Sequence, residues 1–305
     1  MTVVSLRARA AAAATALGCL VAAEGCVDIA LSGDMQVIER EEHRFQVQPA
    51  PRVTLTTFDG SIQIRTWDRS EVEVTVEKRA SDEASAEDIE VRAEQDGNHV
   101  AVEARIKPGA VVGGLFSLSH RSARLIVSLP ATARVEARSG DGSIDVEGVG
   151  GGVELQSGDG SIRGRELSGG VLVQTGDGSV RLENVSGPLD ARTGDGSIDV
   201  DGAFEALRLR TGDGSIRVAA APGSVARTGW DITTGDGSVL LELPAGFSGD
   251  VDARTGDGRI TTSGIELTRL DSEDGRRALR GRLGSGGSTV HVRTGDGSIR
   301  LVGTE

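Results

Sequence analysis

Apolar and polar residues alternate in short runs along most of this chain, and the runs recur at a fixed interval. The segment Gly-Asp-Gly-Ser begins at residues 140, 158, 176, 194 and 212, which lie 18 residues apart, and again at 235 and 295. A Gly-Asp-Gly-Arg variant begins at 256, and Asp59-Gly60-Ser61 is an earlier relative. A fixed short period predicts a solenoid, in which each repeat stacks on its neighbours.

Each 18-residue unit predicts two short strands. Ile144-Asp145-Val146 alternates between apolar and polar residues after the turn, and Val153-Glu154-Leu155 does so nine residues later. Such alternation of β-branched residues indicates half-buried strands. Equivalent residues of successive coils should stack about 4.8 Å apart along a rod. We therefore expect an all-β fold, a β-solenoid of 18-residue coils with two short strands each.

The composition fits a narrow core between two such sheets. The chain has 44 Gly but no Tyr, only two Trp and five Phe, so rows of aliphatic side chains must fill the interior. Glycine tolerates the positive φ of tight reversals. We expect that conformation at the second glycine of each turn, which is Gly142, Gly160, Gly178, Gly196 and Gly214.

The repeats occupy residues 131–305, with an insertion at 264–289 before the last coil. Residues 51–130 are less regular and form the N-terminal part of the β domain. Strands are expected there around Val53, Ile62, Val72, Val100 and Leu125. A short helix is expected at 81–88, with Ser81 or Asp82 as its cap. Residues 27–50 are polar and predict a tether.

The first 26 residues predict an export signal. Arg7 and Arg9 precede an apolar run at 10–23, which has the length of a signal core and is too short to span a membrane. Cleavage near Ala23 and lipidation of Cys26 both fit this segment. The prediction is an exported protein of the periplasm, outer envelope or cell surface, with possible membrane attachment through an N-terminal lipid.

Charge and cysteine content exclude several function classes. There are 33 basic and 46 acidic residues, and the net charge of −13 repels phosphate backbones, so no nucleic-acid partner is expected. Both cysteines lie within the first 26 residues, so the mature chain has no disulfide framework or cysteine zinc site.

The aspartates of the repeated turns should form a ladder. One interpretation is a row of calcium sites, since hard cations take carboxylate oxygens, although the β-roll calcium motif places its Asp differently. The other is structural, each Asp bonding a backbone N–H of its own turn, and it is the one we favour. Repulsion between neighbours in water is below about 1 kcal/mol, less than a turn bond to a charged group contributes. The ladder comprises Asp141, Asp159, Asp177, Asp195, Asp213, Asp236, Asp257 and Asp296.

No residue pattern predicts catalysis. The turn serines are expected to bond their own turn or the next coil, because no His accompanies them at a repeating position. A polysaccharide-acting enzyme would need carboxylates gathered in one cleft, whereas these are spread evenly. The strand faces carry mixed charges and no aromatic platform. The basic cluster at Arg276, Arg277, Arg280 and Arg282 should be neutralised by Asp271, Glu273 and Asp274.

Three groups of residues resemble the bacterial DUF4097 proteins, which are described as adhesin-like, exported β-strand repeat proteins. The first runs from Asp59-Gly60-Ser61-Ile62 through Trp67-Asp68 to Val72-Glu73-Val74, and the second from Leu129-Pro130 through Val135 into the repeats. The third is Gly284-Ser285-Gly286-Gly287 before the last turn. The resemblance covers roughly residues 53–303 and implies a β-solenoid-like stack, often exported. It implies no active-site residue.

Together these patterns predict a non-enzymatic envelope scaffold or adhesin-like binding module that needs no cofactor. A calcium-binding rod is the alternative, and a polysaccharide-acting enzyme is a more distant one. The partner is unidentified. The last coil, at 298–302, is followed by only three residues, so this end of the stack should be poorly covered and end-to-end self-association is possible.

Overall fold

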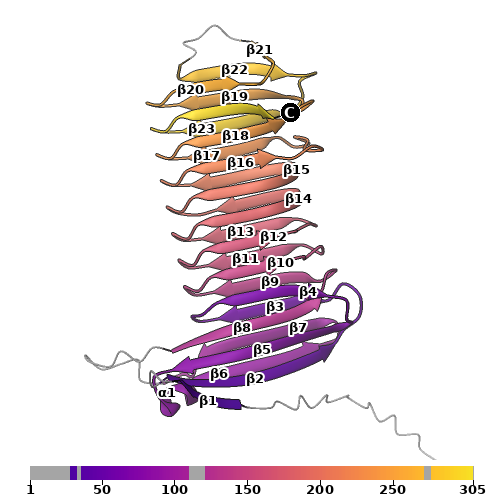
Figure 1. The fold of residues 1–305 in the computed structure, drawn as a ribbon, viewed down its shortest axis with the longest axis vertical. Coiled ribbons are helices and arrows are strands. Elements are labelled where there is room, and N and C mark those ends of the chain that lie inside the picture. Colours follow the sequence, from indigo (N-terminus) through magenta and orange to yellow (C-terminus); the bar gives the residue numbers. More distant parts are fainter. Residues whose placement is uncertain (1–27, 33–35, 110–120, 271–275, 305) are drawn as a thin grey trace, which may run out of the picture.

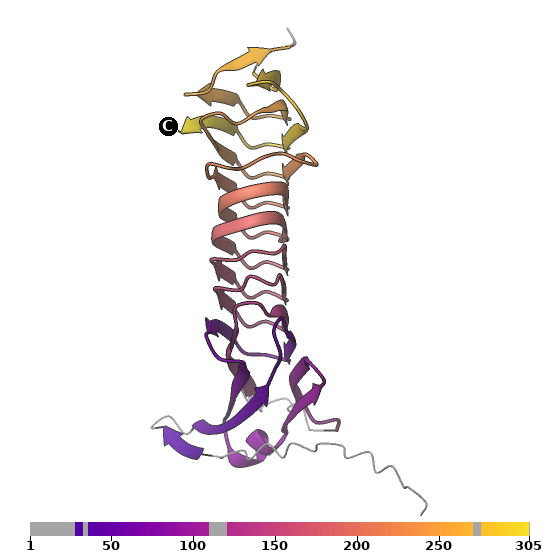
Figure 2. The same ribbon diagram turned by 90° about the vertical axis from the view of Figure 1, so that its right-hand side faces the viewer.

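The computed structural model describes residues 28–32, 36–109, 121–270 and 276–304. They form a tall rod of stacked strands (Figure 1). Two sheets face each other along the rod, as the view turned by 90° shows (Figure 2). The predicted all-β class is therefore confirmed. The expected signal segment and Cys26 lie outside the described residues.

The first sheet contains the strands that follow the Gly-Asp-Gly turns. It is parallel from β8 to β20, and β1, β2 and β5 add antiparallel strands at the base. Its order along the axis is β1 (Asp28–Ser32), β2 (Gln36–Gln46), β5 (Glu71–Ala80), β8 (Arg121–Pro130), β4 (Ile62–Trp67), β10 (Ile144–Glu147), β12 (Ile162–Arg165), β14 (Val180–Arg192), β15 (Ile198–Thr211), β16 (Ile216–Ala220), β18 (Val239–Pro244), β24 (Ile299–Thr304) and β20 (Ile260–Ser263).

The second sheet contains the other strand of each coil. It is parallel from β7 to β19, and antiparallel strands close both of its ends. Its order is β6 (Ile89–Asp96), β7 (His99–Ile106), β3 (Arg52–Thr57), β9 (Arg134–Ser139), β11 (Val153–Ser157), β13 (Val171–Thr175), then the later halves of β14 and β15, β17 (Trp230–Thr234), β23 (Thr289–Thr294), β19 (Gly249–Thr255), β22 (Ala278–Leu283) and β21 (Leu267–Arg269).

The register of the sheets follows the sequence period. Ile144 pairs with Ile162, which pairs with Val180, and Val153 pairs with Val171, so equivalent residues stack 18 apart. Their aliphatic side chains are buried in one continuous core between the sheets. The few aromatic residues of the repeats also lie inside, where Trp230 packs between Phe204 and Phe247, with ring centroids at 6.2 and 5.0 Å. Stacked rows of similar size explain the aliphatic composition.

The turn glycines are required for a reason other than the expected one. None of Gly142, Gly160, Gly178, Gly196 and Gly214 has a positive φ. Instead, a Cβ on any of them would overlap the carbonyl oxygen of the equivalent glycine one coil below. The stacked turns approach so closely that no side chain fits. Positive φ occurs in the opposite turns, for example at Gly152 and Gly170.

A buried hydroxyl before each Gly-Asp-Gly holds the turn in place. Ser157 Oγ donates to the Gly142 carbonyl at 2.9 Å and accepts from the Gly160 N–H at 3.1 Å. The same pair of bonds recurs at Thr211, with distances of 2.8 and 3.3 Å. Each of these two hydroxyls thus satisfies one carbonyl and one N–H of the turn glycines and links two coils. The row comprises Thr57, Ser139, Ser157, Thr175, Thr193, Thr211, Thr234, Thr294 and Thr255.

The N-terminal part is more structured than a tether. Residues 36–46, which were expected to belong to the tether at 27–50, form β2 and pair antiparallel with β5. Phe45 and Val47 pack against the core, and this burial explains why a mostly polar segment forms a strand. The expected helix is confirmed as α1 (Glu83–Glu87), with Asp82 as its N-cap accepting from Ser85 N at 2.7 Å. The predicted strands lie within β3, β4, β5, β7 and β8.

The last coil does not end the stack, contrary to expectation. β23 lies between β17 and β19, and β24 lies between β18 and β20. The insertion at 264–289 contributes β21 and β22, which lie beyond β19 at this end of the second sheet. β3 and β4 are threaded in the same way near the base, between β7 and β9 and between β8 and β10. The coil formed by β3 and β4 and the coil formed by β23 and β24 therefore each have a pairing partner on both sides.

Among the described residues, no helix has the length and apolar character that a membrane span requires.

Candidate functional site: a groove across the second sheet

A groove of about 940 Å³ lies on the outer face of the second sheet. It crosses β3, β9, β11, β13, β14, β15, β17 and β23, so it runs along the rod axis and across the strands. At the usual strand spacing, eight strands span about 34 Å. We call this feature the long groove.

The floor of the long groove is low because one outward row consists only of glycine, alanine and proline. In successive coils this row is Gly152, Gly170, Pro188, Ala206 and Gly229, each directly before a buried apolar residue of the second sheet. The turns beside it contribute Gly169, Thr228 and Ser288. A row of small residues flanked by longer side chains leaves a channel with exposed backbone.

Beside the floor, a row of mostly charged side chains forms one wall of the long groove. Glu136, Glu154, Asp190, Arg208 and Asp231 follow one another, with Leu172 between the second and third. Arginines hold these carboxylates in place: Arg138 bonds Glu154 at 3.2 Å, and Arg192 bonds Asp190 at 3.0 Å. The wall is therefore neutralised within the protein and held in a defined geometry.

The carboxylate of Asp231 in this wall is also paired with an arginine, and the pairing lowers its pKa. Burial alone would raise its pKa, but bonds from Arg210, at 3.1 Å, and from Thr233 hold the pKa below its ordinary value. The carboxylate is therefore ionised across the physiological range. His291 continues the same wall on the neighbouring strand β23.

At the base end the groove begins with two arginines. Arg52 on β3 and Arg134 on β9 are direct cross-strand neighbours, and both are exposed. Neither forms an ion pair within the described part of the chain. They differ in this respect from the arginines of the groove wall.

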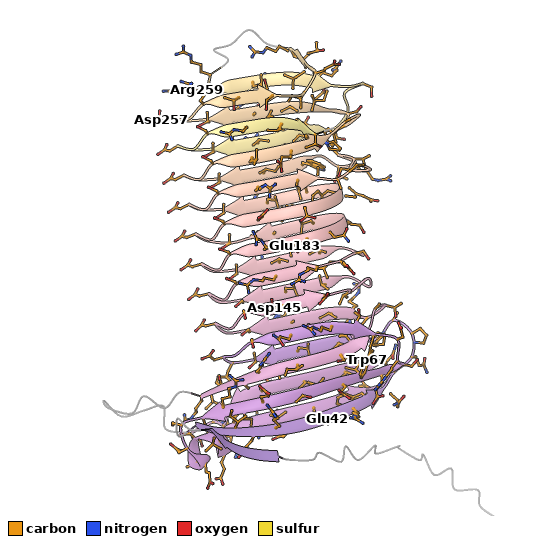
Figure 3. All side chains as sticks on the ribbon, in the orientation of Figure 1. Glu42, Trp67, Asp145, Glu183, Asp257 and Arg259 are labelled. Atoms are coloured by element: carbon orange, nitrogen blue, oxygen red, sulfur yellow. The ribbon has the colours of Figure 1, made fainter. Side chains whose placement is uncertain are left out.

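A second groove, of about 790 Å³, follows the turn serines on the first sheet. Ser215 Oγ accepts from Ser238 N at 3.4 Å, and Ser238 Oγ accepts from Ser298 N at 3.3 Å. Ser298 in turn accepts from Arg259 N at 3.3 Å. The expected bonding of turn serines to the next coil is confirmed at these three positions. Arg259 of the variant turn ends this row, at the edge of the rod near Asp257 (Figure 3).

The aspartate ladder is exposed and does not hold the turns. All eight ladder residues are exposed, and no bond from their carboxylates to a turn N–H occurs in the described chain. The expected turn bonds come instead from the buried Ser and Thr hydroxyls. Among the described residues, no three acidic, His or Cys side chains lie close enough together to hold one metal ion. Asp257 pairs with Arg277 at 3.4 Å.

Charges of the two strand faces pair as expected from their mixed signs. On the first sheet, Asp199 lies 3.0 Å from Arg181 and 3.8 Å from Arg217, and Figure 3 shows Asp145 and Glu183 along its strands. Two arginines of the basic cluster lie on β22 and pair with β19, with Arg282 at 2.9 Å from Asp250 and Arg280 at 3.7 Å from Asp252. Asp271, Glu273 and Asp274, the partners expected from the sequence, lie outside the described residues.

The three histidines in the described part of the chain lie on three different strands, β2, β7 and β23. His99 Nε2 is 3.0 Å from Thr54 Oγ1, and His291 Nδ1 is 3.5 Å from an Arg293 nitrogen. Neither these two nor His43 bonds a turn serine in the described chain. His43 lies in a half-buried polar cluster on β2 and β5 at the base, 3.6 Å from Glu41, whose other oxygen contacts Lys78. His43 and Lys78 together hold the pKa of Glu41 at about 2.

Comparison with known proteins agrees with this architecture. The Toastrack DUF4097 family model matches residues 51–302, nearly the whole described chain. The chain belongs to the Toastrack DUF4097 family. The resemblance seen in the sequence is thereby confirmed, and it identifies no catalytic residue. No curated protein matches this Toastrack chain at a significant level.

Three solved structures are similar to this Toastrack protein at low identity. A protein of Clostridium sporogenes provisionally named for cell adhesion is 13% identical, with a TM-score of 0.28, and the match covers 87% of this chain and 100% of that one. A provisionally named adhesin of Bacteroides fragilis is 11% identical, with a TM-score of 0.38. A provisionally named lipid-binding protein of Parabacteroides distasonis is 11% identical, with a TM-score of 0.40. Both of the latter matches cover 86% of this chain and 96% of the other chain.

Two features of the site escaped sequence reasoning although each has a signal. A small residue precedes the second strand in five successive coils, which marks the groove floor. Arg52 and Arg134 each stand immediately before a buried Val, at Val53 and Val135, so they occupy equivalent positions. Only the threading of β3 beside β9 makes them neighbours.

Proposed function

We propose that this protein is a non-catalytic, exported rod of the cell envelope that binds an extended partner in the long groove. The observation that carries the proposal is the groove's length and direction. It crosses eight strands along the axis, and its floor consists of residues with little or no side chain. A linear molecule lying along the rod would contact the same pair of rows in each coil.

The chemistry of the groove supports binding in preference to catalysis. Its carboxylates are paired with arginines, and a carboxylate held in an ion pair is poorly placed to exchange a proton with a substrate. The wall offers both donors and acceptors in a fixed arrangement, and a rigid site loses little conformational entropy on binding. The residues of the charged wall lie on strands, which hold side chains more firmly than loops do.

Filling the groove tests this proposal. Ala206 lies half-buried in the floor, so Ala206→Trp should block the channel at its middle. Ala219 is equally half-buried and faces outward on β16 of the opposite sheet, so Ala219→Trp is the matched control. We expect Ala206→Trp to weaken binding of the purified protein to isolated cell envelopes by roughly tenfold or more. Equal binding by both variants, with equal melting temperatures, would refute the groove as the binding site.

The envelope location rests on the expected signal segment and needs its own test. Fractionation of cells that produce a C-terminally tagged chain should place the protein outside the cytoplasm. If Cys26 carries the lipid, metabolic labelling with palmitate should disappear in Cys26→Ala and persist in Cys19→Ala. Recovery of the unprocessed, full-length chain from the cytosol would contradict export.

A further inference from the structure

Arg52 and Arg134 form an unusual pair at the base end of the long groove. They sit directly opposite each other on adjacent parallel strands, in the same outward row as the groove floor. Like charges in this arrangement destabilise a sheet. At the spacing of adjacent strands, each guanidinium can reach the same small ligand.

No acidic side chain in the described part of the chain forms an ion pair with either arginine. Glu136, two residues along from Arg134, is held by Arg138. His99 is the neighbour of Arg52 on the other side, and its Nε2 bonds Thr54 at 3.0 Å. Asp96, beyond His99 on β6, forms no ion pair with either arginine in the described chain. On a protein of net charge −13, these two adjacent positive charges therefore have no ion-pair partner among the described residues.

We propose that Arg52 and Arg134 form an oxyanion-binding site that takes a carboxylate or phosphate group of the molecule lying in the long groove. A guanidinium offers paired N–H donors that match such groups, and two of them can hold one anion from both sides. A bound anion also removes the repulsion between the two arginines. The site deepens the proposed function, because it sets the charge and the orientation of the extended partner.

Thermal unfolding of the full chain in sodium phosphate and in sodium chloride, at equal ionic strength, tests the site directly. We expect phosphate to raise the melting temperature of the wild type, since a ligand that binds only the folded state stabilises it. The rise should be lost in the double variant Arg52→Gln/Arg134→Gln. Arg300→Gln is the matched control, because Arg300 faces outward on β24 and has no ion pair in the described chain.

The variants also separate an anion site from a structural role. In chloride, either single substitution should leave the melting temperature unchanged or raise it, because a repulsion is removed. A clear fall would show that the arginines stabilise the fold, and it would overturn the proposal. An equal phosphate-dependent rise in the wild type, the double variant and Arg300→Gln would show only the general stabilising effect of phosphate, and it would overturn the proposal too.

Linear polymers then identify the source of the anion. A polyuronate and a polyphosphate should be compared with a neutral glucan by fluorescence anisotropy of labelled protein. We expect one of the charged polymers to bind about tenfold or more weakly to the double variant than to Arg300→Gln. Ala206→Trp separates the two proposals. If phosphate still raises its melting temperature while polymer binding persists unchanged, the anion site stands and the groove proposal fails.

Discussion

Replacing Leu301 by alanine tests the threading of the last coil into the rod. The Leu301 side chain has no exposed surface, and its strand β24 pairs with β18 on one side and β20 on the other. A leucine in a coil at the open end of a stack would have lost its neighbour on one side. Leu→Ala substitutions at fully packed positions cost about 2–5 kcal/mol, which combines the lost transfer free energy with the cavity left behind.

We therefore expect Leu301→Ala to lower the free energy of unfolding by at least about 2 kcal/mol. Urea unfolding followed by tryptophan fluorescence can measure this change. Trp230 reports on the affected region, because it pairs with Val290 on β23 and is 1% exposed. Trp67, near the base, should be replaced by Phe in the background protein so that the signal is local.

Leu267→Ala provides the comparison, because Leu267 is half-buried on the three-residue strand β21 at the end of the second sheet. We expect it to cost less than Leu301→Ala. Hydrogen exchange gives an independent measure, and the amides of β24 should be protected as strongly as those of β18. A cost below about 1 kcal/mol for Leu301→Ala, or rapid exchange throughout β24, would refute the threading.

Three further predictions concern the turn hydroxyls, the half-buried polar cluster at the base and the aspartate ladder. Thr211→Val removes two bonds to buried glycine backbone groups and should cost about 1–3 kcal/mol in urea unfolding, whereas Thr211→Ser should retain most of the stability. The pKa of Glu41 is lowered from 4.5 to about 2, so its contribution of up to about 3 kcal/mol is present above pH 4.5 and is lost as the pH falls toward 2. Glu41→Gln should therefore show a weaker loss of stability over that pH range, and an unchanged pH profile would contradict the assignment. For the exposed ladder of turn aspartates, melts followed by circular dichroism in calcium and in EDTA should coincide, and a large rise with calcium would favour the calcium-binding alternative.

The sequence alone determines the repeating part of this fold. The 18-residue period and the alternation around Ile144 and Val153 specify two strands per coil, because a one-residue slip would turn every apolar side chain toward water. The helix at Glu83–Glu87 was equally readable from its Asp82 cap. These features depend on local geometry and on burial of one strand face, and residues close together in the sequence specify both.

The tertiary structure decided what depends on contacts between distant segments. Local sequence does not specify that β3 stacks between β7 and β9, or that β23 and β24 lie inside the stack, because one aliphatic coil packs on another with similar free energy. For the same reason, the sequence did not predict the antiparallel pairing of β2 with β5. It also did not predict the long groove and the Arg52–Arg134 pair, which exist only once successive coils bring equivalent positions into register.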